Sequence, residues 1–238
     1  MKISVKQVLS ESISLYKENF KKMAVISLVM FAYYVLSQLM GRMTAIADEH
    51  PYLIWVALAL SIVVLFVVII FLPKLYLAIM IWFNSLLEKN KMTFGESYRR
   101  TQGKYWLSVG CMFLMVLWYM PMVIFREKPF GVEVRTLYAA FVTSFFYTLF
   151  PMIAIEPRGR RYLRRSVQLI KGNYISALML TFIMATIPAM MNRVFIHVFQ
   201  GKPAELYWIG VIYELISSFI LPVVYMAQVI VYRQLKHQ

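Results

Sequence analysis

Residues 52–72 read YLIWVALALSIVVLFVVIIFL and contain no charged side chain. A helix of this length rises about 30 Å at 1.5 Å per residue, which is the thickness of the hydrocarbon core of a bilayer. Inside hydrocarbon every backbone N–H and C=O must be paired within the segment, so a run this long and this apolar predicts a membrane-spanning helix. This stretch therefore places the chain in the class of all-α integral membrane proteins.

The composition of the whole chain agrees with that class. Of its 238 residues, 61% are hydrophobic and 16% are aromatic. Soluble domains use roughly 45 to 50% apolar residues, and a water-soluble fold of this size would leave too much apolar surface exposed. We therefore expect residues 1–238 to form a single membrane domain.

Windows of roughly 20 residues predict about six transmembrane helices. They lie near residues 23–41, 52–72 with a helical continuation to about 87, 105–125, 136–155, 174–199 and 207–232. Ala45-Ile46-Ala47 resembles a signal-peptidase site after the first of them. However, the charged leader and the apolar run that precede this site are both longer than those of a usual signal peptide, so we expect the first span to be retained.

The 25 Lys and Arg residues predict the orientation in the membrane. They gather in the N-terminal segment and in the loops at 88–104 and 156–173, whereas the three other loops carry few basic residues, each accompanied by acids. Cytoplasmic loops hold the excess of Lys and Arg, so both termini are expected in the cytoplasm. A net charge of +14 can also indicate nucleic-acid binding, but basic residues at the ends of apolar stretches indicate a bilayer as the partner.

Three segments align without a gap and indicate internal repeats. They are LSESI at 9–13, FGESY at 94–98 and LRRSV at 163–167. From the first residue of each segment, large side chains mostly recur at the i, i+4, i+7, i+11 spacing of one helical face, with basic residues on much of the rest. The three apolar stripes are Leu9, Ile13, Tyr16 and Phe20; Phe94, Tyr98, Thr101 and Tyr105; and Leu163, Val167, Ile170 and Tyr174. The pattern predicts three repeats, at approximately 1–87, 88–156 and 157–238, each a cytoplasmic interfacial amphipathic helix followed by a transmembrane hairpin.

The second arms of the hairpins share a proline. FLPKLYLA at 71–78 resembles ILPVVYMA at 220–227, and LFPMIA at 149–154 fits the same frame less well. Proline removes one backbone donor and bends a helix, a cost that neighbouring helices can offset within a bundle.

Two of these patches carry a family resemblance. Pro157-Arg158-Gly159 followed by RSVQLIKGNY at 165–174 resembles the arginine-serine and lysine-glycine-asparagine-aromatic signature of a broad group of bacterial membrane proteins. That group includes YciC-like proteins and the membrane domain attached to some glycerophosphoryl diester phosphodiesterases, and LYKENF at 15–20 is similar to its usual opening. The resemblance implies a multi-pass protein of the bacterial cytoplasmic membrane with an undefined molecular role, and it transfers no catalytic residue.

Motifs for chemistry are absent from the sequence. There is no GxxxxGK[ST] phosphate loop, no HExxH zinc motif and no GxGxxG nucleotide loop. His50, His197 and His237 lie far apart, so we expect no catalytic residue, cofactor or metal site, and no enzyme. His50 beside Asp48 and Glu49 is read either as a weak cation site or as a solvated loop.

Ionisable residues at membrane depth are the candidate polar sites, because burying one at a helix centre costs roughly 2.5 to 3.5 kcal/mol. Arg193 and Glu214 fall at similar depth on antiparallel helices and are predicted to form an ion pair across the third hairpin, the alternative being separate contacts with headgroups and a wet crevice. Lys74 follows Pro73 and either extends to the headgroups or is functional.

Basic residues between 159 and 171 are the candidate contacts with anionic lipid headgroups. They are Arg160, Arg161, Arg164, Arg165 and Lys171.

Three classes of function remain open. The first is a non-enzymatic scaffold or accessory protein that binds membrane partners or anionic lipid; the alternatives are a small transporter or permease subunit, and an intramembrane enzyme.

Overall fold

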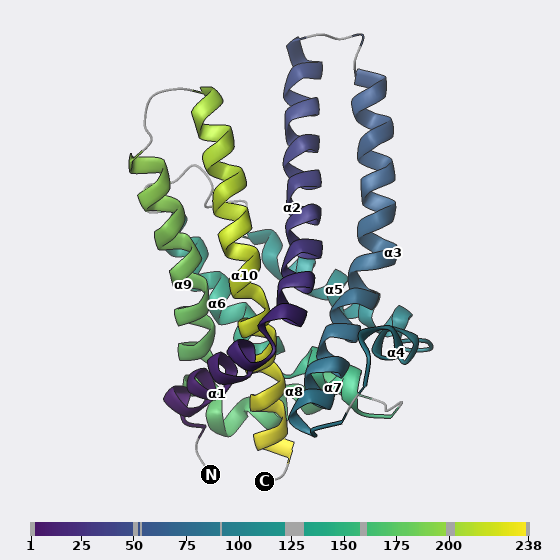
Figure 1. The fold of residues 1–238 in the computed structure, drawn as a ribbon, viewed down its shortest axis with the longest axis vertical. Helices are drawn as coiled ribbons and strands as arrows, with labels where there is room; N and C mark the ends of the chain where they lie inside the picture. The colour runs from purple at the N-terminus through teal and green to yellow at the C-terminus, as the bar shows by residue number, and fades with distance from the viewer. Residues whose placement is uncertain are drawn as a thin grey trace.

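The computed structural model describes residues 3–49, 52, 54–90, 92–121, 131–157, 161–198 and 203–236. Every regular element within these ranges is a helix, which confirms the all-α class (Figure 1). In chain order they are α1 (Val5–Glu18), α2 (Phe20–Glu49), α3 (Ile54–Leu87), α4 (Phe94–Arg99), α5 (Tyr105–Tyr119), α6 (Gly131–Phe146), α7 (Leu149–Ile155), α8 (Tyr162–Ile170), the 3₁₀ turn η3 (Lys171–Asn173), α9 (Tyr174–Val198) and α10 (Pro203–Lys236).

Within the residues that the structure describes, four helical segments are long and apolar enough to cross a membrane, and they are Ile70–Leu87, Val134–Ile155, Tyr162–Ile187 and Gly210–Lys236. A fifth arises if α1 and α2, which meet at 97°, count as one bent span. The sequence predicts about six, so that number is met in part. The shortfall includes α5, whose 15 residues cover only about 22 Å at 1.5 Å per residue, less than the roughly 30 Å of hydrocarbon.

The break between α1 and α2 is made by Asn19. Its backbone leaves the helical conformation, and its side-chain amide donates a hydrogen bond to the carbonyl oxygen of Leu15 at 3.1 Å. The backbone N–H of Asn19 donates to the same carbonyl oxygen at 3.1 Å, so Asn19 closes the last turn of α1 with both its backbone and its side chain. As a result α1 lies across the end of the bundle, whereas α2 runs along it (Figure 1).

The helices α1, α4 and α8 lie at one end of the molecule, together with the last turns of α10 (Figure 1). We call this the basic end. Each of the three precedes a pair of longer, apolar helices in the chain. Each also packs against a helix from another pair: α1 against α10, α4 against α3, and α8 against α6 and α7.

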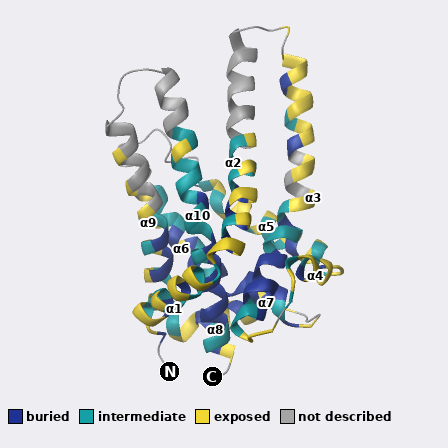
Figure 2. Ribbon diagram, viewed as in Figure 1, coloured by how far each residue is buried: buried dark blue, intermediate teal, exposed yellow. Residues whose placement is uncertain are grey.

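The core lies toward the basic end, where α3, α7 and α10 contact one another (Figure 2). Residues 77–83, 149–154 and 225–232 are all buried there. The ring of Tyr76 lies 4.6 Å from that of Tyr225 and 4.9 Å from that of Phe150, measured between centroids. These aromatic contacts join the three helices beside their prolines.

Two of the three aligned prolines lie within long helices, and the third begins a short one. Pro73 and Pro222 lie inside α3 and α10. Pro151 is in the first turn of α7, where a backbone N–H would have no helical partner in any case. The weaker fit of LFPMIA at 149–154 thus coincides with a break in the helix at Tyr147 and Thr148.

Much of the side surface of the bundle is apolar. Large hydrophobic side chains are exposed along α2, α3, α5 and α9, for example Val25, Val63, Phe113 and Met179. So many exposed large hydrophobic side chains are unusual in a soluble monomer and are typical of contact with lipid tails.

Candidate functional site

One serine anchors each short helix at the basic end. Ser12, Ser97 and Ser166, the aligned serines of the three segments, are each 0% exposed. The Ser12 hydroxyl donates to the carbonyl oxygen of Val8 at 2.7 Å, and that of Ser97 donates to the carbonyl oxygen of Thr93 at 3.1 Å. Ser166 is hydrogen-bonded to the Thr148 hydroxyl at 2.8 Å. A small side chain whose hydroxyl has a hydrogen-bond partner lets each helix approach the bundle closely.

Because Ser12 and Ser166 face the bundle, apolar side chains on other faces of these segments are exposed. Ile13 and Phe20 are exposed on the first segment, and Leu163 and Val167 on the third. These residues belong to the predicted apolar stripes, whereas Ile170 from the same stripe is buried. The buried serine position was not singled out from the sequence, although the alignment contains it.

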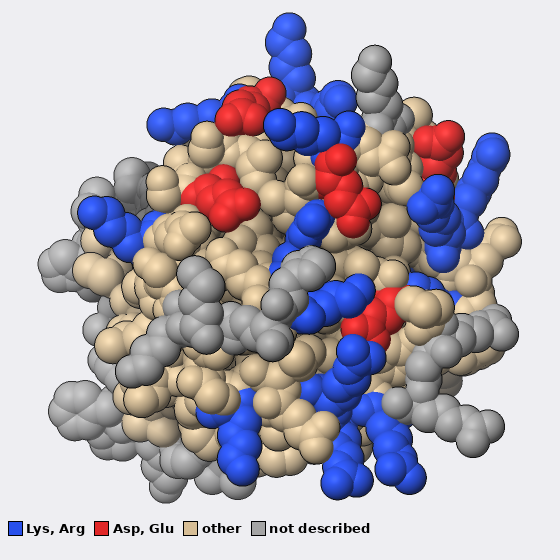
Figure 3. Space-filling model, turned by 90° about the horizontal axis from the view of Figure 1, so that it is seen from below, with Lys and Arg blue, Asp and Glu red and all other residues tan. Residues whose placement is uncertain are grey.

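Lys and Arg side chains surround the basic end, with fewer Asp and Glu among them (Figure 3). Arg161, Arg164 and Lys171 are exposed on or beside α8, and none of them forms an ion pair with a described residue. Arg160 lies outside the described residues. Three of the five predicted headgroup contacts therefore present free charges at this end.

Arg165 differs from these three because it is ion-paired. Its Nη1 lies 2.6 Å from Oε2 of Glu156, and the hydroxyl of Tyr232 donates to Oε1 of the same carboxylate at 2.6 Å. Glu156 is only 6% exposed. Charge-assisted hydrogen bonds of this kind are about twice as strong as neutral ones. The carboxylate thus ties α8 to α10 just beyond the end of α7.

Lys104 completes this network from another helix. Its Nζ donates to the carbonyl oxygens of Ala154 at 2.8 Å and Glu156 at 2.6 Å. A cation suits this place, since the last carbonyls of α7 lack helical partners and carry partial negative charge. Burial lowers the pKa of Lys104, and the negative charge of Glu156 opposes that shift. Glu156 was missed from the sequence because it begins a basic loop, where an acid is ordinarily solvated.

Asn173, in the lysine-glycine-asparagine-aromatic stretch, holds the start of the chain. Its Oδ1 accepts a hydrogen bond from the backbone N–H of Ile3 at 2.8 Å. The hydroxyl of Ser176 donates to the carbonyl oxygen of Ile3 at 3.1 Å. The stretch that carries the family resemblance therefore has a structural role in this chain.

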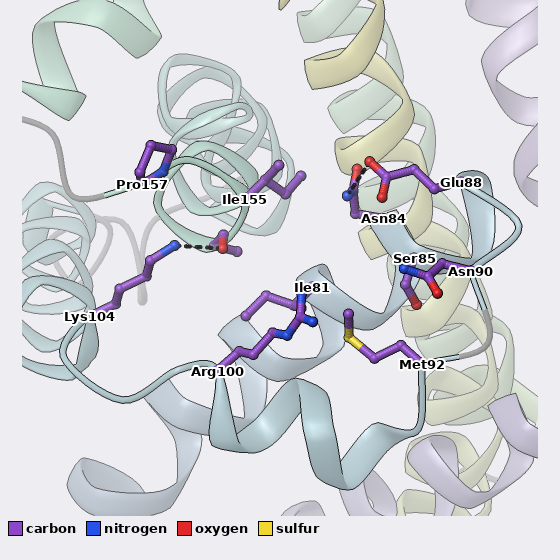
Figure 4. Close-up of a pocket in the computed structure, with 11 residues that line it drawn as sticks. Ile81, Asn84, Ser85, Glu88, Asn90, Met92, Arg100, Lys104, Ile155 and Pro157 are labelled. Atoms are coloured by element: carbon purple, nitrogen blue, oxygen red, sulfur yellow. Dashed lines mark hydrogen bonds between the residues drawn. The ribbon is translucent and has the colours of Figure 1, made fainter.

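A polar cavity of about 420 Å³ opens beside the Glu156 network (Figure 4). It is lined by the end of α3, the turn that follows it, the start of α5 and the end of α7, including Asn84, Glu88, Arg100, Lys104 and Pro157. Glu88 accepts a hydrogen bond from the Asn84 amide at 2.9 Å. These groups can hydrogen-bond a small polar molecule, but they do not form a nucleophile and base pair.

Of the three ionisable residues predicted at membrane depth, the structure describes the side chains of two. Lys74 is half-buried, with its Nζ 5.2 Å from the centroid of the Tyr105 ring, in cation–π contact. Glu214 lines a cavity of about 350 Å³ among α2, α6, α9 and α10, together with Tyr34 and Thr143. The side chain of Arg193 lies outside the described residues, so its ion pair with Glu214 stays a prediction.

Within the described ranges, no three His, Cys, Asp or Glu side chains gather where they could hold a metal ion. His50 and the side chains of Asp48 and Glu49 fall outside these ranges, so neither reading of that cluster is tested.

No protein-family model, no curated protein and no solved structure matches this chain. Its class therefore follows from its own features. The long apolar helices, the apolar sides and the charged end define a helical protein with the make-up of a multi-pass membrane protein.

Proposed function

We propose that this protein is a non-enzymatic scaffold or accessory protein of the membrane, which binds anionic lipid headgroups and membrane partners through its basic end. The observation that carries the proposal is the free charge of Arg161, Arg164 and Lys171 beside the outward-facing Leu163 and Val167. Apolar and basic side chains exposed on one short helix are the composition of an interfacial helix. Each basic residue near an anionic surface contributes about 1 kcal/mol.

The proposal includes an orientation and a location. The basic end faces the cytoplasm, so both termini do as well, and the membrane is the bacterial cytoplasmic membrane. The distribution of Lys and Arg supports the orientation, as does the position of both chain ends beside α1 and α8 (Figure 1). The resemblance to YciC-like proteins and to phosphodiesterase membrane domains supports the bacterial location.

Three repeats remain part of the proposal. Their support is cyclic packing, in which each short helix contacts the second arm of the preceding hairpin. By this rule α4 packs on α3, α8 on α6 and α7, and α1 closes the ring on α10. The first arms obey the same rule, because α2 packs on α10, α5 on α3 and α9 on α6.

Lipid selection in reconstituted bilayers tests the function. Spin-labelled phosphatidylglycerol is expected to associate with the protein more strongly than spin-labelled phosphatidylcholine. Replacing Arg161, Arg164 and Lys171 with Gln should lower that preference severalfold, and 1 M salt should lower it as well, since the Debye length falls to about 3 Å. The control variant exchanges Arg for Lys and Lys for Arg at the same positions and should keep the preference. An unchanged preference in the Gln variant would contradict the proposal.

A second candidate, a small transporter or permease subunit, is favoured by the cavity that contains Glu214. Intramembrane acids that face a cavity commonly mark ion or substrate pathways. Proteoliposomes tested for ion flux separate the two candidates. Flux that disappears in Glu214→Gln and persists in the α8 variant would favour the transporter.

A further inference from the structure

An apolar groove of about 750 Å³ runs between α2, α3 and the start of α4. Trp82 forms its floor and is 3% exposed, whereas Val25 at its rim is 61% exposed. The rings of Trp82 and Phe94 meet edge to face, with centroids 6.2 Å apart. The groove is therefore walled by side chains that pack together and is open to the surroundings along one side.

Both long walls of the groove end in a lysine. Lys22 precedes Val25 and Val29 by three and seven residues, which places all three on one face of α2. Lys89 follows Leu86 by three residues at the end of α3. Both lysines are exposed, and neither forms an ion pair with a residue that the structure describes. The groove thus has an apolar body and one lysine on each of its two long walls.

The length of the apolar body matches one leaflet of a bilayer. From Leu75 to Leu86, eleven residues of α3 rise about 16 Å, and half of the hydrocarbon thickness is roughly 15 Å. An acyl chain fits a groove of this length and polarity, and the positive charges of the two lysines complement a phosphate. The polar residues Asn90 and Thr93 also line the groove beside the lysines.

We infer that this groove binds one anionic diacyl phospholipid. The phosphate lies between Lys22 and Lys89, and one acyl chain lies along Val29, Leu75 and Trp82. The inference deepens the proposed function and depends on its placing of the basic end at an anionic membrane surface. It names a discrete site that is separate from Arg161, Arg164 and Lys171 on α8.

The backbone at Lys89 offers a sharp test of its charge. Lys89 has a φ of 54°, in the left-handed region. Its N–H donates to the carbonyl oxygen of Leu86 at 3.0 Å, and the N–H of Asn90 donates to that of Ser85 at 2.8 Å. Glycine is the residue that favours this position after a helix, because it has no Cβ. Lys89→Gly should therefore preserve or improve the turn while it removes the charge.

Native mass spectrometry of the whole protein in mild detergent tests the site, with dioleoylphosphatidylglycerol as the probe and dioleoylphosphatidylcholine for comparison. We expect one phosphatidylglycerol per protein. Lys22→Gln and Lys89→Gly should each weaken its binding about fivefold, and together about 25-fold. Lys21→Gln is the matched control, since it removes the same charge one residue away and outside the groove.

Val25→Trp tests the apolar body of the groove with its charges intact. The larger side chain should occupy the acyl path and weaken phospholipid binding, while the melting temperature changes little because Val25 is exposed. A protein dimer that dissociates in Val25→Trp, without a change in lipid binding, would overturn the inference in favour of a second copy. Displacement of the lipid by millimolar inorganic phosphate would also overturn it, because the acyl chain would then contribute nothing.

The α8 variant with Gln at Arg161, Arg164 and Lys171 separates this inference from the proposed function. It should keep the one bound phosphatidylglycerol and lose the general preference for anionic lipid. If the groove variants bind the lipid like the wild type while the α8 variant loses the preference, the inference is wrong and the proposed function stands. If the wild type shows neither bound lipid nor preference, both are wrong.

Discussion

Ser12 is 0% exposed at the contact between α1 and α10, so it limits how large a side chain this contact accepts. Ser12→Leu inserts extra methylenes into a close-packed region and is expected to lower the free energy of unfolding by about 1–3 kcal/mol. The matched control is Ser14→Leu on the same helix, where the side chain is exposed. Thermal unfolding in detergent measures both variants, and equal losses would contradict the role given to the buried serines.

The carboxylate of Glu156 depends on Tyr232 for one of its two side-chain hydrogen bonds. Tyr232→Phe removes a bond to a charged group and should cost about 1.5–3 kcal/mol of stability. A double-mutant cycle with Glu156→Gln should show strong coupling, because the two residues share that bond. Tyr162→Phe serves as a comparison, since its hydroxyl donates to the neutral carbonyl oxygen of Pro157 at 2.7 Å and the loss should be smaller. Additive losses at Tyr232 and Glu156 would argue against the network.

Glu96 makes the start of α4 sensitive to acid. The backbone N–H and the hydroxyl of Thr93 donate to its carboxylate at 2.7 and 3.0 Å, and these bonds hold its pKa below the usual 4.5. A carboxyl with a lowered pKa in the folded state stabilises that state above its ordinary pKa, and the contribution is lost as the pH falls through the lowered value. The protection factors of the α4 amides, which compare the observed exchange rate with the intrinsic rate at the same pH, should therefore fall below about pH 4.5. In Glu96→Gln this pH dependence should be absent.

At the scale of elements, the placement of α4 defines a topology experiment. In a Cys111→Ala background, Gln102→Cys lies in the exposed turn between α4 and α5, and Tyr52→Cys lies at the opposite end of the molecule, where Tyr52 is 72% exposed. A membrane-impermeant thiol reagent applied to intact cells should label the thiol introduced at position 52 and spare the one at position 102, because the basic end is proposed to face the cytoplasm. The reverse pattern would invert the topology. Ser97 is unsuitable for labelling, since it is buried.

Local features of the short helices determine how they are arranged at the basic end. The bend of 97° at Asn19 turns α1 across the bundle, and the capping box of Thr93 and Glu96 begins α4 immediately after a turn. Each helix then faces the bundle with a serine and the surroundings with larger or charged side chains. The amphipathic pattern in these segments therefore serves packing on one face, and the proposed function assigns the other face to contact with the membrane surface.

At the scale of the whole molecule, the two ends of the chain are joined through Asn173 and α10. Asn173→Ala removes the acceptor for the N–H of Ile3 and should destabilise the N-terminal segment by about 1 kcal/mol. Hydrogen exchange of residues 3–18 is expected to accelerate, with Gln168→Ala on the exposed face of α8 as the control. Unchanged exchange in Asn173→Ala would show that the packing of α1 on α10 suffices.

Local sequence is enough to predict the class of this protein, the positions of its long helices and the gathering of cations at one end. Length, hydropathy and charge are properties of single segments, so α3 extends to Leu87 and Arg161, Arg164 and Lys171 are exposed as the sequence indicates. Among the described residues, four spans are found, or five with the bent pair, where the sequence predicts about six. The helix α5 ends at Tyr119, and hydropathy alone does not show where a helix ends.

The remaining features required the tertiary structure, because they depend on which helix faces meet. Tyr232 reaches Glu156 across 76 positions of the chain, and Ile3 reaches Asn173 across 170. The lipid groove likewise combines Lys22 and Trp82, which no local pattern relates. Apolar helices can associate through many alternative faces in lipid, where the hydrophobic effect does not choose among them. Packing and buried hydrogen bonds select one arrangement, and that selection creates the Glu156 network and the groove.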